Sequence, residues 1–265
     1  MRRFYCENLP EAGAQLRLGG DEAHHAVKVL RLGAGAPVQL LDGRGTIAEA
    51  VVTAVERERR ELLLACRIAS RRCCPPPRRP VRLLVAPPRA KLMGQIVRQA
   101  TELGVWRLTP VLCGFSVARP DAEGGGLAHW REEALAALKQ SGNPYLPVLD
   151  EPVSFAEAVA GETAPGVFGA PPDPRGTSTG ALPVEGPYLP LWVGPEGGFT
   201  EAETARLLAA GHRPLALGSW ILRIETAVAA LLGFLQGMAA SEEAGNGAPG
   251  SAPALPSAHG KGAAC

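Results

Sequence analysis

The stretch that decides the fold occupies residues 189–203 and reads LPLWVGPEGGFTEAE. Its first five residues have the length and apolarity of a buried strand, and the glycine-rich segment 194–199 follows as a turn. Thr200 and Glu203 have the spacing of a capping box, which predicts a helix start. Such a turn exposes backbone N–H and C=O groups to a flat ligand. It lacks the GK[ST] of a P-loop and the GxGxxG of a dinucleotide site, so an ordinary turn is an equal alternative here.

A second segment with a similar character occupies residues 215–227 and reads LALGSWILRIETA. Its pattern predicts a strand that ends at Gly218, a short irregular stretch, and a long apolar helix that begins near Glu225. Arg223 and Glu225 are charges in an otherwise apolar background. Because a buried charge is costly unless it is paired, these two side chains either pair with each other and fix the last helix, or face a ligand.

Upstream of these segments, strands alternate with helices from residue 81 onward. The pattern predicts strands at 81–86 and 108–113, helices at 91–103 and 127–140, and short strands near Val167 and Leu191. Gly104 and Gly142 stand where the two helices should stop. This order favours an α/β fold with a mostly parallel sheet covered by helices.

The first seventy residues have the pattern of a small β structure. Asp42-Gly43 is typical of a tight hairpin turn, a short helix is expected over 21–32, and five or so short strands would close into a barrel. Residues 71–80 read RRCCPPPRRP, and four prolines in ten exclude a helix or a central strand. This segment is therefore interpreted as a stiff basic linker at a domain boundary.

The positive charge of the chain is concentrated in one segment. The 265 residues carry a net charge of +1, yet residues 62–101 contain nine Arg or Lys and no Asp or Glu. Blocks of like charge are either solvated or neutralised by a partner anion, and phosphate backbones are the usual partner. A solvated surface is the alternative interpretation.

The composition, 46% hydrophobic and 20% charged, excludes several protein classes. No run approaches the roughly 18 apolar residues of a membrane helix, and the basic start is followed by no apolar core of a secretory signal. The six cysteines form no CxxC pair, so reduced thiols are expected rather than disulfides or zinc. None of the five histidines has metal-ligand spacing.

Taken together, residues 192–199, 217–227 and 101–105 resemble the 16S ribosomal RNA uridine-N3 methyltransferase (RsmE) family, within the knotted SPOUT class. Residues 139–142, 3–5 and 25–31 add supporting matches. Order and spacing are kept over the whole chain except its tail. The resemblance implies an α/β fold with a SPOUT-type parallel sheet and a C-terminal trefoil knot, preceded by a small PUA-like β-barrel. The expected limits are 1–72 for the barrel, 73–80 for the linker, 81–240 for the methyltransferase domain and 241–265 for a disordered tail.

The resemblance also implies S-adenosylmethionine as cofactor and a homodimer in which two subunits build each active site. The residues implied to bind the cofactor are Phe168, Gly169, Gly194, Glu196, Gly197, Leu217, Gly218, Ile221, Leu222 and Thr226. Arg223 would favour the anionic form of the uracil imide, and Glu225 is the candidate proton acceptor. No metal is required, because a methyl sulfonium is already a strong electrophile and mainly needs alignment.

The implied partner is 16S ribosomal RNA or the 30S subunit, in the cytoplasm and without a membrane. The candidate RNA-binding residues are Arg3, Arg31, Arg78, Arg79, Arg82 and Lys91. Phe115, Lys139, Asn143 and Ile224 differ from the family pattern. They keep open an alternative from another class, a non-catalytic or redirected SPOUT paralogue that binds RNA and cofactor.

Overall fold

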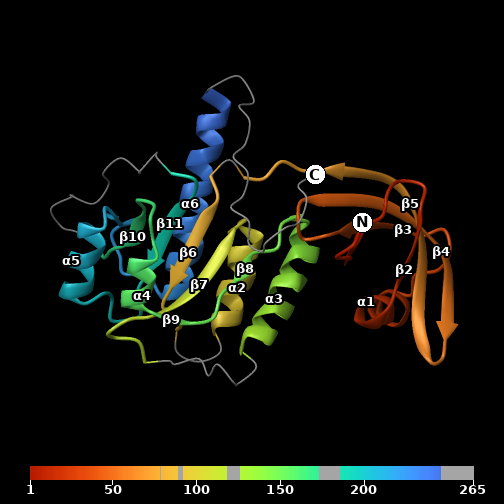
Figure 1. Ribbon diagram of the computed structural model, residues 1–265, viewed down its shortest axis with the longest axis horizontal. Coiled ribbons are helices and arrows are strands. Elements are labelled where there is room, and N and C mark those ends of the chain that lie inside the picture. Colours follow the sequence, from red (N-terminus) through yellow and green to blue (C-terminus); the bar gives the residue numbers. More distant parts are fainter. Residues whose placement is uncertain (78, 89–91, 118–125, 173–185, 246–265) are drawn as a thin grey trace. The chain divides into compact units, whose positions relative to one another are not determined.

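The computed structural model describes residues 1–77, 79–88, 92–117, 126–172 and 186–245 (Figure 1). The described chain forms two compact units. Unit 1 comprises residues 1–75 and 135–146, and unit 2 comprises 76–134 together with the chain from 147 onward. The expected domain limits assigned residues 135–146 to the methyltransferase domain, whereas the structure assigns them to unit 1.

Unit 1 contains one five-stranded sheet with strand order β1-β3-β4-β5-β2. Its elements are β1 (Arg2–Tyr5), β2 (Gln15–Leu18), α1 (Gly20–His24), the π-helix η1 (His25–Val29), β3 (Pro37–Leu41), β4 (Thr46–Glu58) and β5 (Glu61–Cys73). Strands β1 and β3 are parallel, and the other neighbours are antiparallel. Among the described residues the two edge strands do not pair with each other, so the sheet is open and not the closed barrel that was expected.

Two local predictions in unit 1 are corrected by the structure. The segment 71–73 is not linker but the end of β5, where it pairs with residues 46–48 of β4. The reason is that the prolines begin only at Pro75, so the three residues before Cys74 keep the N–H groups that a strand needs. The helix expected over 21–32 consists of two parts, α1 and the π-helix η1 that follows it directly. It ends at Val29, three residues before the expected end.

The segment 135–146 is held in unit 1 by polar and apolar contacts. The Arg3 guanidinium donates to the backbone carbonyls of Lys139 (3.3 Å) and Gln140 (2.8 Å) at the end of α3 (Gly126–Ser141). A cation at the C-terminus of a helix satisfies carbonyls that have no partner within the helix. Leu138 packs with the buried Leu41 and Ile47 of the sheet. The last turns of α3 are therefore part of the core of unit 1.

Unit 2 is built on a seven-stranded sheet with strand order β12-β10-β11-β6-β7-β8, and β9 also pairs with β7. Its strands are β6 (Val81–Val85), β7 (Arg107–Leu112), β8 (Val148–Leu149), β9 (Val153–Ser154), β10 (Val167–Gly169), β11 (Leu189–Val193) and β12 (Arg213–Leu215). Its helices are α2 (Met93–Glu102), the first part of α3, α4 (Phe155–Ala160), α5 (Glu201–Ala209) and α6 (Ile224–Gly245). All the strand pairings are parallel, which confirms the predicted α/β fold with a parallel sheet.

Helices cover both faces of this sheet, which is why every residue of β11 is buried (Figure 1). Phe168 and Trp192 pack with Phe155 of α4 and Leu207 of α5 on one face. The next residue of β10, Gly169, points to the other face, where a Cβ atom would lie 3.2 Å from Leu231 of α6. Because successive side chains of a strand point to opposite faces of the sheet, α4 and α5 cover one face and α6 covers the other. Helix α6 packs beside α2.

The end of the described chain differs from the expected tail. Residues 241–245 continue α6, because Ser-Glu-Glu-Ala is compatible with a helix, whereas residues 246–265 lie outside the described residues. No helix within the described ranges is long and apolar enough to cross a membrane. In the same ranges no three His, Cys, Asp or Glu side chains gather as metal ligands, and the five described cysteines are free thiols.

Candidate active site

Three loops lie at one edge of the unit 2 sheet. Strands β12, β10 and β11 are adjacent and parallel, so their carboxyl ends meet at the same edge. The loops that leave them begin at Ala170, Gly194 and Ala216. A hydrogen bond from the Ala170 N–H to the Leu215 carbonyl (3.0 Å) joins the first loop to the end of β12. The two glycine-containing segments singled out in the sequence therefore leave the same edge of the sheet, on either side of β10.

The loop after β11 is a tight turn. The Gly198 N–H donates to the Pro195 carbonyl (2.8 Å), and Gly198 has φ +75°, a region that favours glycine. A Cβ atom at Gly194 would lie 3.2 Å from the ring of Phe199. The close approach of backbone and ring means that a side chain at this position would have to displace the ring slightly. Glu196 and Gly197 are exposed at the tip of the turn.

Glu203 anchors this turn to the loop after β7. The Thr200 side chain and the Glu203 carboxylate form the predicted capping box at the start of α5. The same buried carboxylate also accepts a hydrogen bond from the backbone N–H of Gly114 (2.7 Å). The following residue, Phe115, lies against Gly197, where a Cβ atom would be 3.2 Å from the Phe115 Cβ. Glu203 thus holds an exposed aromatic ring over the glycine-rich turn.

The neighbouring Cys113 is not a nucleophile candidate. Burial raises the pKa of its thiol to about 12, and the nearby Glu203 carboxylate acts in the same direction. A thiol with this pKa is protonated at neutral pH, and the thiolate is the reactive form.

The loop after β12 leaves its backbone and several apolar side chains open. The strand ends at Leu215, three residues before the expected end at Gly218, which has φ +69°. The backbone N–H groups of residues 217–222 have no hydrogen-bond partner among the described residues. Ile221 is 83% exposed and Leu222 is 37% exposed. Free amide groups beside apolar side chains are suited to a flat, partly polar ligand.

Arg223 and Glu225 do not form the ion pair that was one of the two interpretations of this segment. Arg223 is exposed, and its side chain has no ion pair or hydrogen bond within the described part of the chain. Glu225 is half-buried in the first turn of α6, where a carboxylate is favourable to the helix dipole. The guanidinium is therefore available to a ligand at the edge where the three loops meet.

Among the remaining predicted cofactor residues, Phe168 lies at the edge with its side chain turned into the core. Its side chain is buried in the sheet core and meets the Phe199 ring edge-on at 6.1 Å, so only its backbone is near the loop. Gly169 ends β10 beside the loops, Leu217 is half-buried, and Thr226 is exposed in the first turn of α6.

Two of the predicted RNA-binding arginines have internal roles. Arg3 binds the end of α3, as described above. Arg82, with a side chain 15% exposed, pairs with the fully buried Glu162 (3.1 Å) and donates to the Thr109 hydroxyl (3.3 Å). Glu162 also accepts from the Tyr188 hydroxyl (2.6 Å). These internal hydrogen bonds occupy part of each guanidinium, and the assignment of Arg3 and Arg82 to RNA stays a prediction.

The four other candidates for RNA binding differ in exposure, and two of them lie outside the described residues. Arg31 is exposed, has φ +54°, and makes no ion pair with any described residue. Arg79 is half-buried and has an interaction of its own. Arg78 and Lys91 lie outside the described residues. Among the candidates that the structure describes, Arg31 is thus the one that is exposed and makes no ion pair.

Two residues that depart from the resembled pattern have structural roles in unit 1. Lys139 forms an ion pair with Glu22 (2.5 Å). The Asn143 side-chain carbonyl accepts a hydrogen bond from the Tyr145 N–H (3.0 Å) and so shapes the turn after α3. Both side chains contribute to the packing of residues 135–146.

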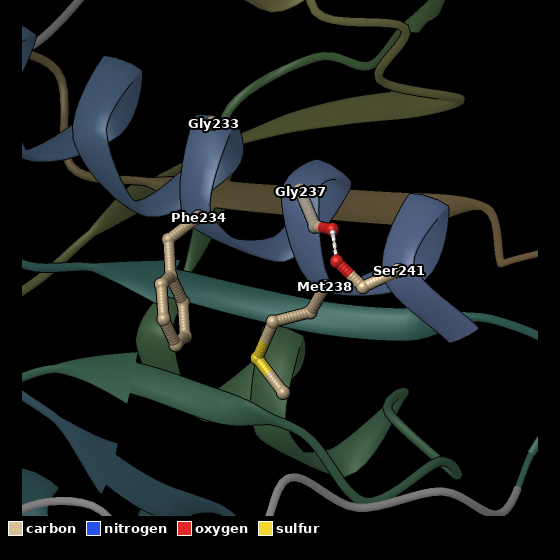
Figure 2. A pocket seen from close by; sticks show the side chains of 5 residues that line it. All are labelled: Gly233, Phe234, Gly237, Met238 and Ser241. Carbon is tan, nitrogen blue, oxygen red and sulfur yellow. Dashed lines mark hydrogen bonds between the residues drawn. The ribbon is translucent and has the colours of Figure 1, made fainter. Parts of the chain in front are cut away.

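An open apolar hollow of about 610 Å³ lies along α6 in unit 2 (Figure 2). Its described lining is Gly233, Phe234, Gly237, Met238 and Ser241. Figure 2 shows Phe234 and Met238 extending from the same side of the helix, while the Ser241 hydroxyl donates to the Gly237 carbonyl (2.9 Å). The glycines leave a flat strip of backbone beside two apolar side chains.

Comparison with known proteins identifies the chain. A family model described as an RNA methyltransferase domain matches residues 75–236, and one described as an RNA methyltransferase PUA domain matches residues 18–62. The chain belongs to the RNA methyltransferase family. Its unit 1 accordingly carries the PUA domain of this family, although the sheet is open.

Individual relatives of this RNA methyltransferase agree with the family models. A protein of Mycobacterium bovis named ribosomal RNA small subunit methyltransferase E is 32% identical over 240 residues, which cover 87% of this chain and 89% of the relative. A Synechocystis protein of the same name is 29% identical over 81% of this chain and 70% of its own length.

Solved structures lead to the same family. A ribosomal RNA small subunit methyltransferase E of Neisseria gonorrhoeae bound to S-adenosyl methionine has a TM-score of 0.77 at 25% identity, covering 90% of this chain and 98% of that chain. A putative methyltransferase of Legionella pneumophila with bound SAM has a TM-score of 0.77 at 26% identity, covering 89% and 97%.

Proposed function

We propose that this RNA methyltransferase uses S-adenosylmethionine to methylate N3 of a uridine in the 16S ribosomal RNA of the small subunit. The observation that carries the proposal is the meeting of three loops at the carboxyl ends of β10, β11 and β12, in a chain of this family. Relatives with the small-subunit methyltransferase name support the substrate, and their SAM-bound structures support the methyl donor.

The loop residues fit the donor chemically. The unpartnered amides of 217–222 are suited to the polar edge of an adenine, and the exposed Ile221 and Leu222 to its faces. Gly194, Gly197 and Gly218 let the backbone approach closely, while Gly169, Leu217 and Thr226 lie on the same edge. Glu196 is assigned as the acceptor of hydrogen bonds from ribose hydroxyls. When bound, the sulfonium supplies an electrophilic methyl group that requires no metal.

The acceptor must lose a proton before it can attack. The N3 of uracil carries an imide proton, and the exposed Arg223 guanidinium would stabilise the negative charge that forms on the ring when this proton leaves. Glu225 lies two residues further along the chain and is assigned as the proton acceptor. Because N3 is on the Watson–Crick edge, the uridine has to be presented unpaired.

The proposed activity is tested with purified protein, tritium-labelled donor, and 30S subunits from a strain that lacks the native enzyme. The expected result is tritium in 16S RNA, mapped to 3-methyluridine. Naked 16S RNA serves as a second substrate and separates recognition of the assembled subunit from recognition of RNA alone. Donor binding in calorimetry without transfer to either substrate would instead favour the alternative of a paralogue that binds RNA and cofactor.

RNA binding is assigned in part to unit 1, through Arg31. The side chain is exposed and unpartnered in the described structure, and a non-glycine residue at φ +54° is conformationally costly. This conformation is common where a helix ends, and here the Leu32 N–H closes the end of η1 on the Ala26 carbonyl (3.0 Å), so the assignment rests on the exposed and unpaired guanidinium.

We expect Arg31→Gly to weaken RNA binding and to reduce the slope of log affinity against log salt by about one. Glycine tolerates the positive φ, so the unfolding midpoint should not fall. The affinity is measured by filter binding to 16S RNA fragments over a salt series. Arg17→Ala is the matched control, since Arg17 is exposed but already paired with Glu56 and Glu58. Equal slopes for wild type and Arg31→Gly would exclude a phosphate contact at this residue.

The proposal includes a homodimer in the cytoplasm and a SPOUT-type trefoil knot in the second half of unit 2. The knot rests on the resemblance of segments 192–199 and 217–227 to that class. The homodimer is supported by the hollow along α6, where small residues four apart allow a second helix to approach. A second copy of this chain is the assigned occupant of that hollow.

We expect Gly237→Leu to dissociate the dimer without unfolding the subunit. A Cβ atom at Gly237 meets nothing within 4 Å in the single chain, and leucine favours a helix over glycine. Sedimentation equilibrium at several protein concentrations should show a weaker dimer by tenfold or more, with an unchanged circular dichroism spectrum. An unchanged dimer constant would place the subunit contact elsewhere.

A further inference from the structure

Trp220 is the most conspicuous side chain of the β12 loop. It is 81% exposed, although tryptophan is among the largest apolar side chains. It lies two residues after Gly218 and three before Arg223, inside the segment assigned to the methyl donor. Neither the donor chemistry nor the proton transfer uses it. An indole exposed in this loop is open to contact with a partner.

The surroundings of Trp220 favour a nucleobase as that partner. The same loop carries Arg223 three residues further on, and its guanidinium has no ion pair or hydrogen bond among the described residues. Proteins hold unpaired bases by stacking them on aromatic rings and on arginine planes. Tryptophan also occurs in protein–protein contacts, but an indole followed three residues later by an unpaired guanidinium matches a base attached to a phosphate backbone.

We propose that Trp220 stacks on an unpaired base of the RNA substrate and so presents the acceptor strand to the donor loops. This proposal rests on the proposed function, because it assigns the RNA substrate to the same edge of the sheet. The base is either the target uridine or its neighbour in the strand. In both cases stacking requires the base to leave its helix, which methylation at N3 also demands. Trp220 is then a positioning residue and not a proton-transfer residue.

The distribution of tryptophans makes the stacking directly observable. Trp130 and Trp192 are buried, and Trp106 is half-buried against Tyr188. Trp220 is therefore the indole that a dissolved ligand reaches most easily. A base stacked on it should quench its fluorescence, whereas a phosphate bound elsewhere should not.

The experiment titrates the full-length protein with a single-stranded oligouridylate of about ten nucleotides and with an abasic oligomer of equal length. The oligouridylate should quench the fluorescence of the wild type, and the abasic oligomer should leave it unchanged. Trp220→Phe should lose the quenching but bind within about threefold, because phenylalanine also stacks. Trp220→Ala should bind about tenfold more weakly with an unchanged salt slope, since stacking releases no counterions. Leu208→Ala, at a 51% exposed residue of α5, is the matched control and should bind like the wild type.

Three outcomes would overturn the assignment of Trp220. The first is equal quenching by both oligomers, and the second is an equal affinity of Trp220→Ala and the wild type for the oligouridylate. The third is dissociation of the dimer in Trp220→Ala, which would make the indole a subunit contact. The methyl-transfer assay separates this proposal from the proposed function. Transfer to 30S subunits at the wild-type kcat/KM by Trp220→Ala contradicts the stacking alone. Absence of transfer by the wild type contradicts the proposed function, while base-specific quenching still supports the stacking.

Discussion

Replacement of Arg223 by alanine is expected to lower the rate of methyl transfer by about 10²–10³-fold, which is the effect of removing one donor to a developing anion. The guanidinium is exposed and makes no ion pair or hydrogen bond with described residues, so the fold and the donor affinity should be retained. Single-turnover assays with 30S subunits measure the rate, and calorimetry with S-adenosylmethionine measures the donor affinity.

Two further variants define the role of Arg223. Arg223→Lys should recover only part of the rate, because an ammonium group cannot reproduce the planar pair of donors. Arg206→Ala removes an exposed arginine from α5 in the same unit and should have the wild-type rate. Full turnover by Arg223→Ala would remove the residue from the chemical step.

Replacement of Glu162 by alanine is expected to cause the largest loss of stability, about 3–5 kcal/mol. The Arg82 guanidinium would then remain largely buried without its counter-charge. The Tyr188 hydroxyl and the backbone N–H groups of Thr163 and Ala164 would lose their acceptor as well. Urea unfolding followed by circular dichroism measures the change in the free energy of unfolding of unit 2.

A surface ion pair provides the control for Glu162. Arg17→Ala removes an exposed partner of Glu56 and Glu58 and should cost less than about 1 kcal/mol. Glu162→Gln should lie between the wild type and the alanine variant, because an amide oxygen still accepts hydrogen bonds but carries no charge. A loss below about 1 kcal/mol for Glu162→Ala would show that water replaces the carboxylate.

Local sequence signals predicted much of unit 2. The apolar run 189–193 and the Thr200–Glu203 capping box are confirmed as β11 and the start of α5. Gly104 and Gly142 end their helices at φ +71° and +78°, where glycine is favoured. The helix α4 was missed, although Ser154 and Glu157 have the same capping spacing and form the same box. Its six residues are too few for a helical period to appear.

Contacts between distant residues could not be predicted. A basic run in the sequence assigned Arg82 to RNA, whereas the structure pairs it with Glu162, eighty positions away. Charge alone does not say which face of a strand a side chain occupies or what lies opposite. Trp220 lies within the apolar segment 215–227, whose sequence does not indicate that the indole is exposed, as the structure shows. The link from Glu203 to Gly114 likewise depends on the adjacency of two loops that no local pattern records.

The return of residues 135–146 to unit 1 has a consequence for biosynthesis. The sheet of this unit is complete at Cys73, but its packing against Leu138 and the anchoring of Arg3 require the end of α3. A nascent chain that ends after the proline segment therefore still has an incomplete core in unit 1. This core can be completed only after residues 76–134 of unit 2 have been translated. Cleavage after Pro75 would release neither part with its native interior.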